Sequence, residues 1–287
     1  MDRQLDPEST NSAQIEFWNG EAARKWVDFN PQLDRMLAPL GNLVMERARP
    51  QPGEHVLDIG CGCGTTTLDL ARAVAPGGAV TGLDISEPML AVARQRAKGA
   101  AVPVRIVNAD AESHDLPRAA YDLMFSRFGV MFFANPKIAF ANFHGALKPG
   151  GRLAFVCWRA LDLNPWVTIP YQAAQPFAPA FELAKTDEPG QFAFARREWL
   201  EDILEHAGFI DRQIDPHETT QRIGAGDLDA CVEVILKLGP VSRLLREAEK
   251  SAVPAITAAV RDAVAPYHDG HCIALPAAVW IVSAGRP

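Results

Sequence analysis

The residues with the clearest capacity for chemistry lie in one glycine-rich stretch, His55–Gly64, with the sequence HVLDIGCGCG. Its glycines, Gly60, Gly62 and Gly64, follow a short apolar run and precede a segment with the apolar spacing of a helix. A strand that turns through glycines into a helix presents bare backbone N–H groups and a helix N-terminus to a ligand. Asp58 within the stretch would repel a phosphate, whereas it suits a ligand that carries an ammonium group and hydroxyls. This carboxylate therefore favours S-adenosylmethionine over a dinucleotide.

A second acid, Asp84, ends the apolar stretch AVTGLDIS, about 20 residues after the glycines. An acid at that place can accept hydrogen bonds from ribose hydroxyls. Its alternative role is to cap the next helix, but Ser86 already serves that role. A third apolar stretch ends in Asn108, Ala109 and Asp110, and a fourth runs from Ser126 into aromatic and Met-rich residues up to Phe132. We expect these side chains to meet, because ligands of open α/β sheets bind outside the carboxyl ends of the strands.

The elements that must position these residues alternate between residues 55 and 158. Segments with helical spacing separate the apolar stretches HVLDIG, AVTGLDIS, VRIVNADAES, YDLMFSRFGVMFF and RLAFVCW. This alternation predicts an α/β fold, with a parallel sheet covered by helices on both faces.

The chain after residue 160 has a different character. Residues 161–195 contain too many prolines for a long helix. We expect a helix over residues 196–208, a strand over 210–223, and two helices between residues 227 and 265 that separate near 251–254. The final apolar run, AAVWIVSAG, has the character of an edge strand.

Composition excludes several classes of protein. The net charge of −7 and the pI near 5.5 argue against binding to the phosphate backbone of a nucleic acid. The sequence shows no run of 18 apolar residues and no basic-then-apolar signal pattern, which predicts a cytoplasmic protein without a membrane span. Five scattered cysteines fit reduced thiols, and the C-x-C of Cys61 and Cys63 lacks partners at zinc-like spacing, so no metal is expected.

Five motifs together resemble the class I S-adenosylmethionine-dependent methyltransferases, in particular their quinone-biosynthesis-type small-molecule branch. The motifs are LDIGCGCG, GLDISEPML, NADAESHDLP, YDLMFSRFGVMFF and ALKPGGRLAFVCW, in the order and spacing of the family. They cover about Glu54–Arg159, and FWNGEAARKW and PAAVWIVSAGRP also resemble this branch. The resemblance implies a doubly wound, mostly parallel seven-stranded sheet of the Rossmann-like type. Its last strand would be inserted antiparallel between its neighbours.

The domain organisation that follows is a single methyltransferase domain over residues 1–287. Residues 1–48 would form an N-terminal helical lid, and residues 49–160 the cofactor-binding core. Residues 161–287 would supply an acceptor-specificity insert, cap helices and the last strands. The oligomeric state is left open, and a homo-oligomer is compatible with the sequence.

The resemblance also implies which residues contact S-adenosylmethionine, whose product is S-adenosylhomocysteine. Asp58, Gly60 and Gly62 would hold the methionine part, and Asp84 would accept hydrogen bonds from the ribose hydroxyls. The other expected contacts are those of the glycine loop, the adenine pocket, the end of the fourth strand and the lid: Cys61, Thr65, Ile85, Met89, Asp110, Ala111, Ser126, Arg127, Trp18 and Trp26. Core packing is the alternative role for both tryptophans.

The expected partner is a small, fairly apolar acceptor that receives the methyl group by in-line displacement. Aromatic side chains can face a sulfonium and line an apolar pocket, and the candidates are Phe128, Phe132, Trp158 and Trp166. The sequence does not identify a catalytic base. His114 and Arg127 are the candidates for contact with the reacting groups, and Arg127 would pair either with an acidic acceptor or with a nearby carboxylate.

Two other functions compete with this one. A catalytically silent protein on the same fold could bind the cofactor or a partner, because fold does not fix function. A nicotinamide-dependent oxidoreductase would need G-x-G-x-x-G, and its third glycine would fall on Thr65.

Overall fold

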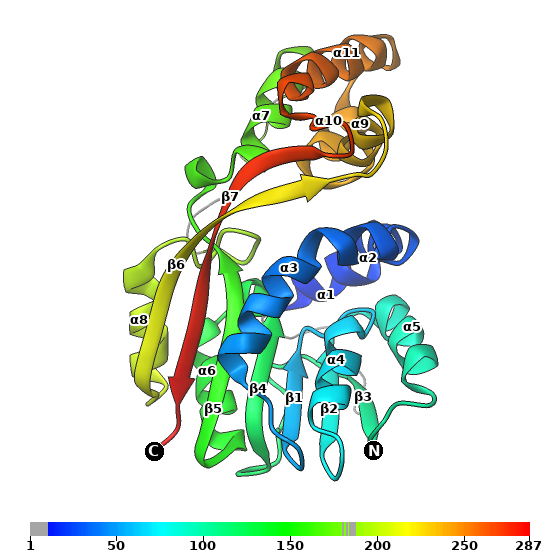
Figure 1. Cartoon of the computed structure of the whole chain (residues 1–287). Helices are drawn as coiled ribbons and strands as arrows, with labels where there is room; N and C mark the ends of the chain where they lie inside the picture. Colours follow the sequence, from blue (N-terminus) through cyan, green and yellow to red (C-terminus); the bar gives the residue numbers. More distant parts are fainter. Residues whose placement is uncertain (1–10, 180, 182, 184–187) are drawn as a thin grey trace. The chain divides into compact units, whose positions relative to one another are not determined.

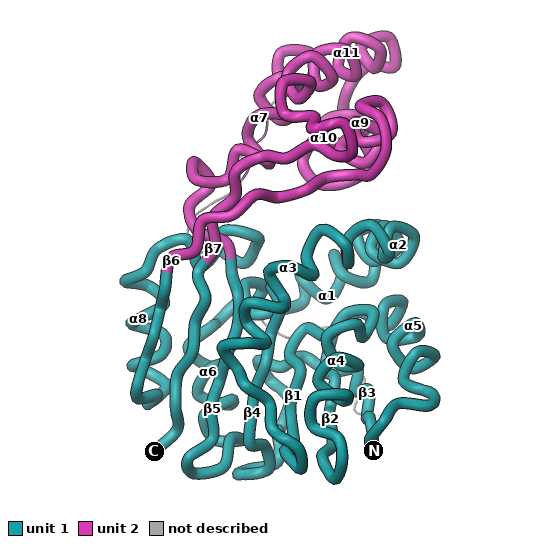
Figure 2. Tube along the Cα trace, viewed as in Figure 1, with its two compact units in different colours: residues 1–157, 186–215, 280–287 teal, residues 158–185, 216–279 magenta. Residues whose placement is uncertain are grey.

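The computed structural model describes residues 11–179, 181, 183 and 188–287, which form two compact units (Figure 2). Unit 1 combines Met1–Cys157, Thr186–Asp215 and Trp280–Pro287, and unit 2 combines Trp158–Lys185 and Pro216–Val279. The sequence predicts one domain with an insert that begins at residue 161, close to the start of unit 2. The expected insert of residues 161–287 nevertheless contributes to both units, because the last two strands run from one unit into the other.

The strands form one seven-stranded sheet in the order β3-β2-β1-β4-β5-β7-β6 (Figure 1). Neighbouring strands among β1 to β5 pair in parallel. The strands are β1 (His55–Ile59), β2 (Ala79–Asp84), β3 (Val104–Asn108), β4 (Tyr121–Arg127), β5 (Leu147–Trp158), β6 (Ile210–Ile223) and β7 (Ile273–Gly285). The predicted Rossmann-like α/β fold is thus confirmed.

The last strand, β7, runs antiparallel between β5 and β6 (Figure 1). The Arg286 backbone N–H donates to the Gly151 carbonyl, and the Arg159 backbone N–H donates to the Ala278 carbonyl. Residue numbers therefore increase along β5 as they decrease along β7. The prediction of an edge strand at AAVWIVSAG is wrong, whereas the inserted antiparallel strand implied by the family resemblance is confirmed. Residues 277–282 are all buried, as expected for a strand covered on both faces.

Helices cover the sheet in unit 1 and form most of unit 2. Those of unit 1 are α1 (Ser12–Asn19), α2 (Glu21–Asp28), α3 (Asn30–Ala48), α4 (Thr65–Ala73), α5 (Glu87–Ala97), α6 (Pro136–Ala146) and α8 (Arg197–His206). Those of unit 2 are α7 (Pro165–Ala174), α9 (Leu228–Lys237), α10 (Gly239–Glu247) and α11 (Val253–Val264). Three helices thus replace the two predicted between residues 227 and 265. Gly239 and Pro240 begin α10, because proline suits the first turn of a helix.

No helix in the described part of the chain combines the length and the apolar character needed to cross a membrane.

The loops after β1 and β4 touch through two glycines. A Cβ atom on Gly60 would lie 2.6 Å from Gly129 Cα, and one on Gly129 would lie 2.6 Å from the Ile59 carbonyl oxygen. Ser126 fixes the same approach, since its hydroxyl donates to the Ile59 carbonyl (2.7 Å) and accepts from the Gly129 N–H (3.1 Å). The glycine loop after β1 therefore has its position set by β4.

This close approach predicts that Gly129→Ala lowers the free energy of unfolding by about 1–3 kcal/mol, because the new methyl group overlaps backbone atoms. Gly129 has a φ of −78°, which any residue adopts, so the loss would report packing alone. The matched control is Gly145→Ala in α6, where the nearest neighbour of the added Cβ lies at 3.7 Å. That substitution should stabilise the protein by about 0.5–1 kcal/mol. Denaturant unfolding measures both, and equal stability of Gly129→Ala and wild type would contradict the packing argument.

Candidate functional site

The expected cofactor residues gather at the carboxyl ends of β1, β2, β3 and β4. Asp58 lies near the end of β1 and Asp84 is the last residue of β2, and Asp84 pairs in register with Asn108, the last residue of β3. Asp110 follows β3 by two residues. Parallel pairing brings these ends to one edge of the sheet, as the alternation of strands and helices predicts.

Asp58 is a buried carboxylate whose two oxygens differ in their hydrogen bonding. Its side chain is 1% exposed, and Oδ2 accepts hydrogen bonds from the hydroxyls of Thr66 (2.8 Å) and Thr67 (2.6 Å) in the first turn of α4. Burial raises the pKa of Asp58 to about 6, although the two threonine hydroxyls and the charge of Arg127 act in the opposite direction. Oδ1 has no hydrogen-bond partner among the described residues. A buried acceptor of this kind suits a donor on a ligand.

Asp84 holds the backbone around it. Its Oδ2 accepts from the Gly62 N–H (2.8 Å) and its Oδ1 from the Ser86 N–H (2.9 Å). Burial raises the pKa of the Asp84 carboxyl, although these backbone hydrogen bonds favour its ionised form. Because a carboxylate offers about four lone-pair sites, acceptor capacity remains for hydroxyl groups.

Ser86 takes the N-cap position of α5, as predicted, but its side chain makes no capping hydrogen bond. The hydroxyl oxygen is buried and has no partner within the described residues. Asp84 bonds the Ser86 N–H instead. The end of β2 therefore carries a second buried polar atom without a hydrogen-bond partner in the described residues.

The three glycines of the loop serve different needs. Gly60 lies against Gly129, and a Cβ atom on Gly64 would lie 3.0 Å from Ala93 Cβ. Gly62 has a φ of +54°, and its added Cβ would have only Met89 Sδ, at 3.9 Å, within 4 Å. The space beside Gly62, next to the expected adenine contact Met89, is therefore not filled by the protein.

Cys61 is a buried thiol of this loop, and burial raises its pKa well above the usual range. A neutral thiol packs as a small apolar side chain. Among the residues that the structure describes, no group of three or more His, Cys, Asp or Glu side chains is arranged to hold a metal.

Asp110 and Ala111 are tied to their surroundings. Asp110 Oδ1 accepts from Asn11 Nδ2 (3.3 Å) and from the Glu112 N–H (3.0 Å). Asn142 Nδ2 donates to the carbonyls of Ala111 (3.1 Å) and His114 (2.7 Å). These bonds fix the loop that the sequence places at the adenine edge.

The side chains of Ser126 and Arg127 have different partners. The Ser126 side chain is fully buried, and both of its hydrogen bonds join the loops after β1 and β4. Arg127 Nη2 donates to Asp34 Oδ1 of α3 (2.9 Å), so of the two predicted alternatives the nearby carboxylate is the one present.

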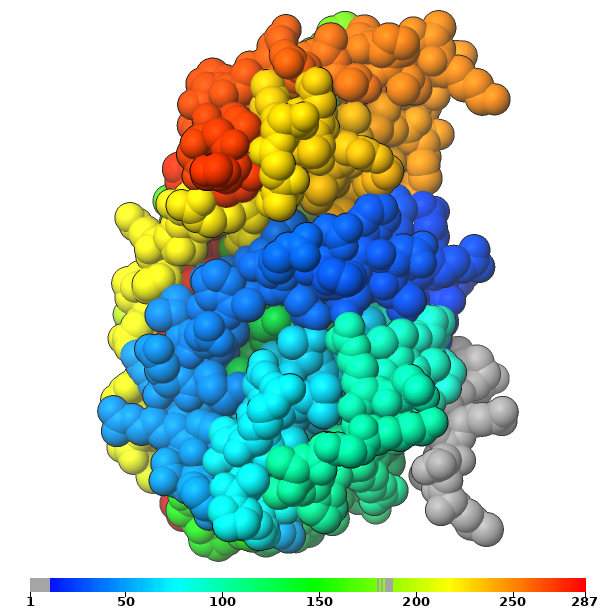
Figure 3. Space-filling model, turned by 45° about the vertical axis from the view of Figure 1, so that its right-hand side comes forward, coloured from blue at the N-terminus to red at the C-terminus, as the bar shows by residue number. Residues whose placement is uncertain are grey.

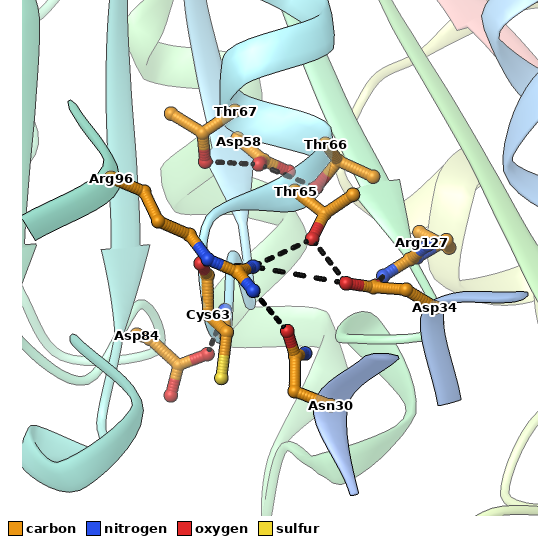
Figure 4. A network of polar contacts seen from close by, with 11 residues as sticks. Asn30, Asp34, Asp58, Cys63, Thr65, Thr66, Thr67, Asp84, Arg96 and Arg127 are labelled. Atoms are coloured by element: carbon orange, nitrogen blue, oxygen red, sulfur yellow. Dashed lines mark hydrogen bonds and ion pairs between the residues drawn. The ribbon is translucent and has the colours of Figure 1, made fainter. Parts of the chain in front are cut away.

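Asp34 belongs to a polar network that joins α3 to the glycine loop (Figure 4). Its Oδ2 accepts from the Thr65 hydroxyl (2.6 Å) and lies 3.8 Å from Arg96 Nη1. Arg96 also donates to the Cys63 carbonyl (3.2 Å) and to Asn30 Oδ1 (2.6 Å). Sequence reasoning missed Asn30, Asp34 and Arg96, because a charged residue in an amphipathic helix gives no signal that distinguishes a partner in another element from solvent.

The N-terminal helix α1 lies over the loops that follow β2, β3 and β4. Asn11 bonds Asp110 after β3, and Asn19 donates to the Ile85 carbonyl (2.9 Å) and accepts from the Glu87 N–H (3.0 Å) after β2. The ring of Trp18 lies 5.1 Å from that of Phe132, which follows β4. Residues 1–10 of the expected lid lie outside the described residues.

The following helix, α2, packs on α5. In Figure 3 the blue side chains of the N-terminal helices meet the cyan and teal side chains of α4 and α5 on the face shown. Trp26 of α2 lies 6.0 Å from Trp18, and both tryptophans are half-buried. They form one aromatic cluster with Phe132.

The expected acceptor residues are divided between the units. Phe128, in unit 1, is buried with a φ of +64°, a strained conformation for a bulky side chain. Trp158 and Trp166, in unit 2, pack with their ring centroids 4.9 Å apart. The contact of each of these residues with an acceptor stays a prediction. His114 is half-buried in the loop after β3, and its role also stays a prediction.

Comparison with known proteins agrees with this geometry. A family model described as "Methyltransferase domain" matches residues 56–151. The chain is 30% identical over 183 residues to demethylmenaquinone methyltransferase of Geobacillus stearothermophilus, which covers 61% of this chain and 78% of that enzyme. It is 34% identical over 118 residues to aklanonic acid methyltransferase of Streptomyces sp. strain C5, which covers 41% of this chain and only 54% of that relative.

A solved structure supports the fold. Phosphoethanolamine N-methyltransferase 2 of Haemonchus contortus, in complex with S-adenosylmethionine, superposes with a TM-score of 0.51 at 20% identity. The match covers 87% of this chain and 52% of that chain. The nicotinamide-dependent alternative receives no support from these relatives. The chain belongs to the class I S-adenosylmethionine-dependent methyltransferases, in their quinone-type small-molecule branch.

Proposed function

We propose that this methyltransferase transfers the methyl group to a small, fairly apolar acceptor by in-line displacement, with the cofactor held at the carboxyl ends of β1 and β2. The observation that carries the proposal is the pair of buried polar atoms there, Asp58 Oδ1 and Ser86 Oγ, which have no partner in the described part of the chain. Unpaired buried polar atoms cost free energy, so a ligand that pairs with them is favoured.

The residues present fit the cofactor. When bound, S-adenosylmethionine supplies a methyl group on a sulfonium leaving group, so alignment and exclusion of water are the main tasks left to the protein. Asp58 Oδ1 would accept from its ammonium group, and the remaining lone pairs of Asp84 would accept from its ribose hydroxyls. The space beside Gly62 and Met89 would receive the adenosine.

Covering the site is the task we assign to the N-terminal helices. Asn19 fixes α1 to the loop after β2, and Trp18 packs on Phe132. An aromatic cover excludes water and offers a ring face to a sulfonium. Trp18 and Trp26 would therefore contribute through this cluster.

The acceptor contacts that we propose in unit 1 are Phe128 and Phe132. The strain at Phe128 supports a functional role, because a bulky residue keeps a left-handed conformation only where its surroundings require it. Phe132 would add apolar surface in the same unit. The two relatives are named for small-molecule acceptors, demethylmenaquinone and aklanonic acid, which agrees with an acceptor of this kind. His114 stays the candidate for proton transfer, since arginine does not deprotonate in proteins.

The direct test is release of S-adenosylhomocysteine from S-adenosylmethionine in the presence of a library of small phenols, acids and quinols. We expect at least one compound to be methylated. Tight cofactor binding without turnover of any compound, together with a stable protein complex in a pull-down, would support the catalytically silent alternative.

The role of Asp84 predicts that Asp84→Ala weakens S-adenosylmethionine binding by about 1–3 kcal/mol, because two hydroxyls lose a charged acceptor. Calorimetry measures the affinity, and thermal unfolding without cofactor checks that the Gly62 loop survives. Asp69→Ala is the matched control, since this exposed acid of α4 pairs with Arg72 of the same helix. Unchanged affinity in Asp84→Ala would remove Asp84 from the site.

The raised pKa of Asp58 predicts a pH dependence of cofactor binding. The carboxyl has a pKa of about 6 in the folded protein, so it takes up a proton as the pH falls through that value, whereas in the unfolded chain it stays ionised down to about pH 4. Its burial therefore costs less stability at pH 5 than at pH 7. An ammonium group binds the ionised form, so affinity for S-adenosylmethionine should fall as the pH drops below about 6.

Asp58→Asn provides the control for this dependence. It should bind more weakly at pH 7.5 and show no change in affinity between pH 5 and pH 7.5 that is due to this site. Calorimetry in two buffers of different ionisation enthalpy measures the proton released on binding. The same pH profile in wild type and Asp58→Asn would show that another group titrates.

The contacts of α1 predict that Asn19→Ala speeds cofactor dissociation about tenfold, because the loss of hydrogen bonds to the loop after β2 is worth about 1–2 kcal/mol. Stopped-flow fluorescence of the tryptophans measures the rate, and hydrogen exchange should quicken in α1. Glu16→Ala, an exposed change in the same helix, is the control. Identical dissociation rates in Asn19→Ala and wild type would show that α1 does not cover the cofactor.

A further inference from the structure

Arg127 is a nearly buried guanidinium with donors to spare. Its side chain is 12% exposed, and it forms one ion pair, from Nη2 to Asp34 Oδ1. Its other N–H groups make no hydrogen bond to the described residues. A guanidinium carries five N–H donors, so most of its donor capacity remains for a ligand.

The helix opposite is shaped around this side chain. A Cβ atom on Gly41 of α3 would lie 3.0 Å from Arg127 Cδ, so the glycine leaves room for the arginine stem. Asp34, seven residues earlier on the same helix, holds the head group. The position of Arg127 is therefore set by α3 rather than left to solvent.

The charges around Asp34 do not balance. Arg96 and Arg127 both lie against this one carboxylate, at 3.8 Å and 2.9 Å (Figure 4). Arg96 donates hydrogen bonds to the Cys63 carbonyl, the Thr65 hydroxyl and Asn30 Oδ1. Two guanidinium groups therefore share one carboxylate beside the glycine loop.

Asp58 supplies the opposite charge in the same neighbourhood. The charge of Arg127 is close enough to lower the pKa of the Asp58 carboxyl. Asp58 Oδ1 is an acceptor without a partner in the described part of the chain, where the side chain of Arg127 donates one hydrogen bond, from Nη2 to Asp34. A ligand that carries an ammonium and a carboxylate on the same carbon atom satisfies both, and such a ligand is an α-amino acid group.

We infer that Arg127, positioned by Asp34, binds the α-carboxylate of the methionine half of the cofactor, while Asp58 binds its ammonium group. This inference rests on the proposed function and names the residue that reads one end of the cofactor. Asp34 acts through Arg127 and is a positioning residue.

The test compares two ligands that differ only in the amino acid end. S-Adenosylhomocysteine carries the α-amino acid, and 5′-methylthioadenosine keeps the adenosine and the sulfur without it. In calorimetry, Arg127→Met should bind S-adenosylhomocysteine about tenfold more weakly or worse, because a charge-assisted hydrogen bond is lost. Its affinity for 5′-methylthioadenosine should equal that of wild type, which also shows that the site is folded.

Two further variants sharpen the comparison. Arg127→Lys should lose less affinity for S-adenosylhomocysteine than Arg127→Met, because the charge stays while the planar fork is lost. Arg35→Met removes the same charge from the exposed face of α3 and should leave both affinities unchanged.

Three outcomes would overturn the inference. An equal loss of affinity for both ligands in Arg127→Met would mean that the arginine only maintains the fold. Unchanged affinity of Arg127→Met for both ligands would mean that Arg127 does not bind the cofactor. If the KM of this variant for the acceptor were then raised, Arg127 would be assigned to an acidic acceptor. A loss of affinity of the same size in Arg35→Met would mean that the effect comes from the net charge of the protein alone. Wild-type protein that binds neither ligand would instead refute the proposed function itself.

Discussion

The buried carboxylate of Asp58 is the constraint around which this methyltransferase is built. A carboxylate that is 1% exposed needs donors, and the first turn of α4 supplies them through Thr66 and Thr67. These bonds fix the start of α4 relative to β1, so the glycine loop between them has little freedom. One oxygen is left without a partner in the described residues. The buried oxygen without a hydrogen bond therefore costs free energy in the folded protein, and a ligand with an ammonium group would remove that cost.

The position of the loop is then set by contacts from two neighbouring strands. On one side, Gly60 and Gly129 approach so closely that a Cβ atom on either would overlap backbone atoms, and Ser126 bonds both loops. Beside it, Asp84 binds the Gly62 N–H. The backbone that would receive the cofactor is therefore preorganised by strands β2 and β4, and little ordering should be required on binding.

The N-terminal segment contacts the carboxyl-end loops through hydrogen bonds and an ion pair. Polar side chains of α1 and α3 reach the carboxyl-end loops: Asn19 at the end of β2, Asn11 after β3, and Asp34 at Arg127 after β4. Each contact joins segments far apart in the chain, so the helices and the core loops become one structure. Strain at Phe128 lies next to Arg127 and Gly129, where β4 meets both α3 and the glycine loop.

The sequence by itself determined the sheet core and the place of two acids at its carboxyl-end edge. Strands and helices alternate visibly from residue 55 to residue 158, and parallel strands must place their carboxyl ends at one edge, so the positions of Asp58 and Asp84 follow from the sequence. Only the tertiary structure decided the partners of Ser126 and Arg127, the interior place of β7 and the contacts of α1 with the carboxyl-end loops. The periodicity of a helix shows which face is polar, but it does not show that Asp34 of that face meets an arginine 93 residues later. Likewise, an apolar strand at the end of the chain reads the same at an edge as in the interior, because its partners are chosen by packing between distant segments.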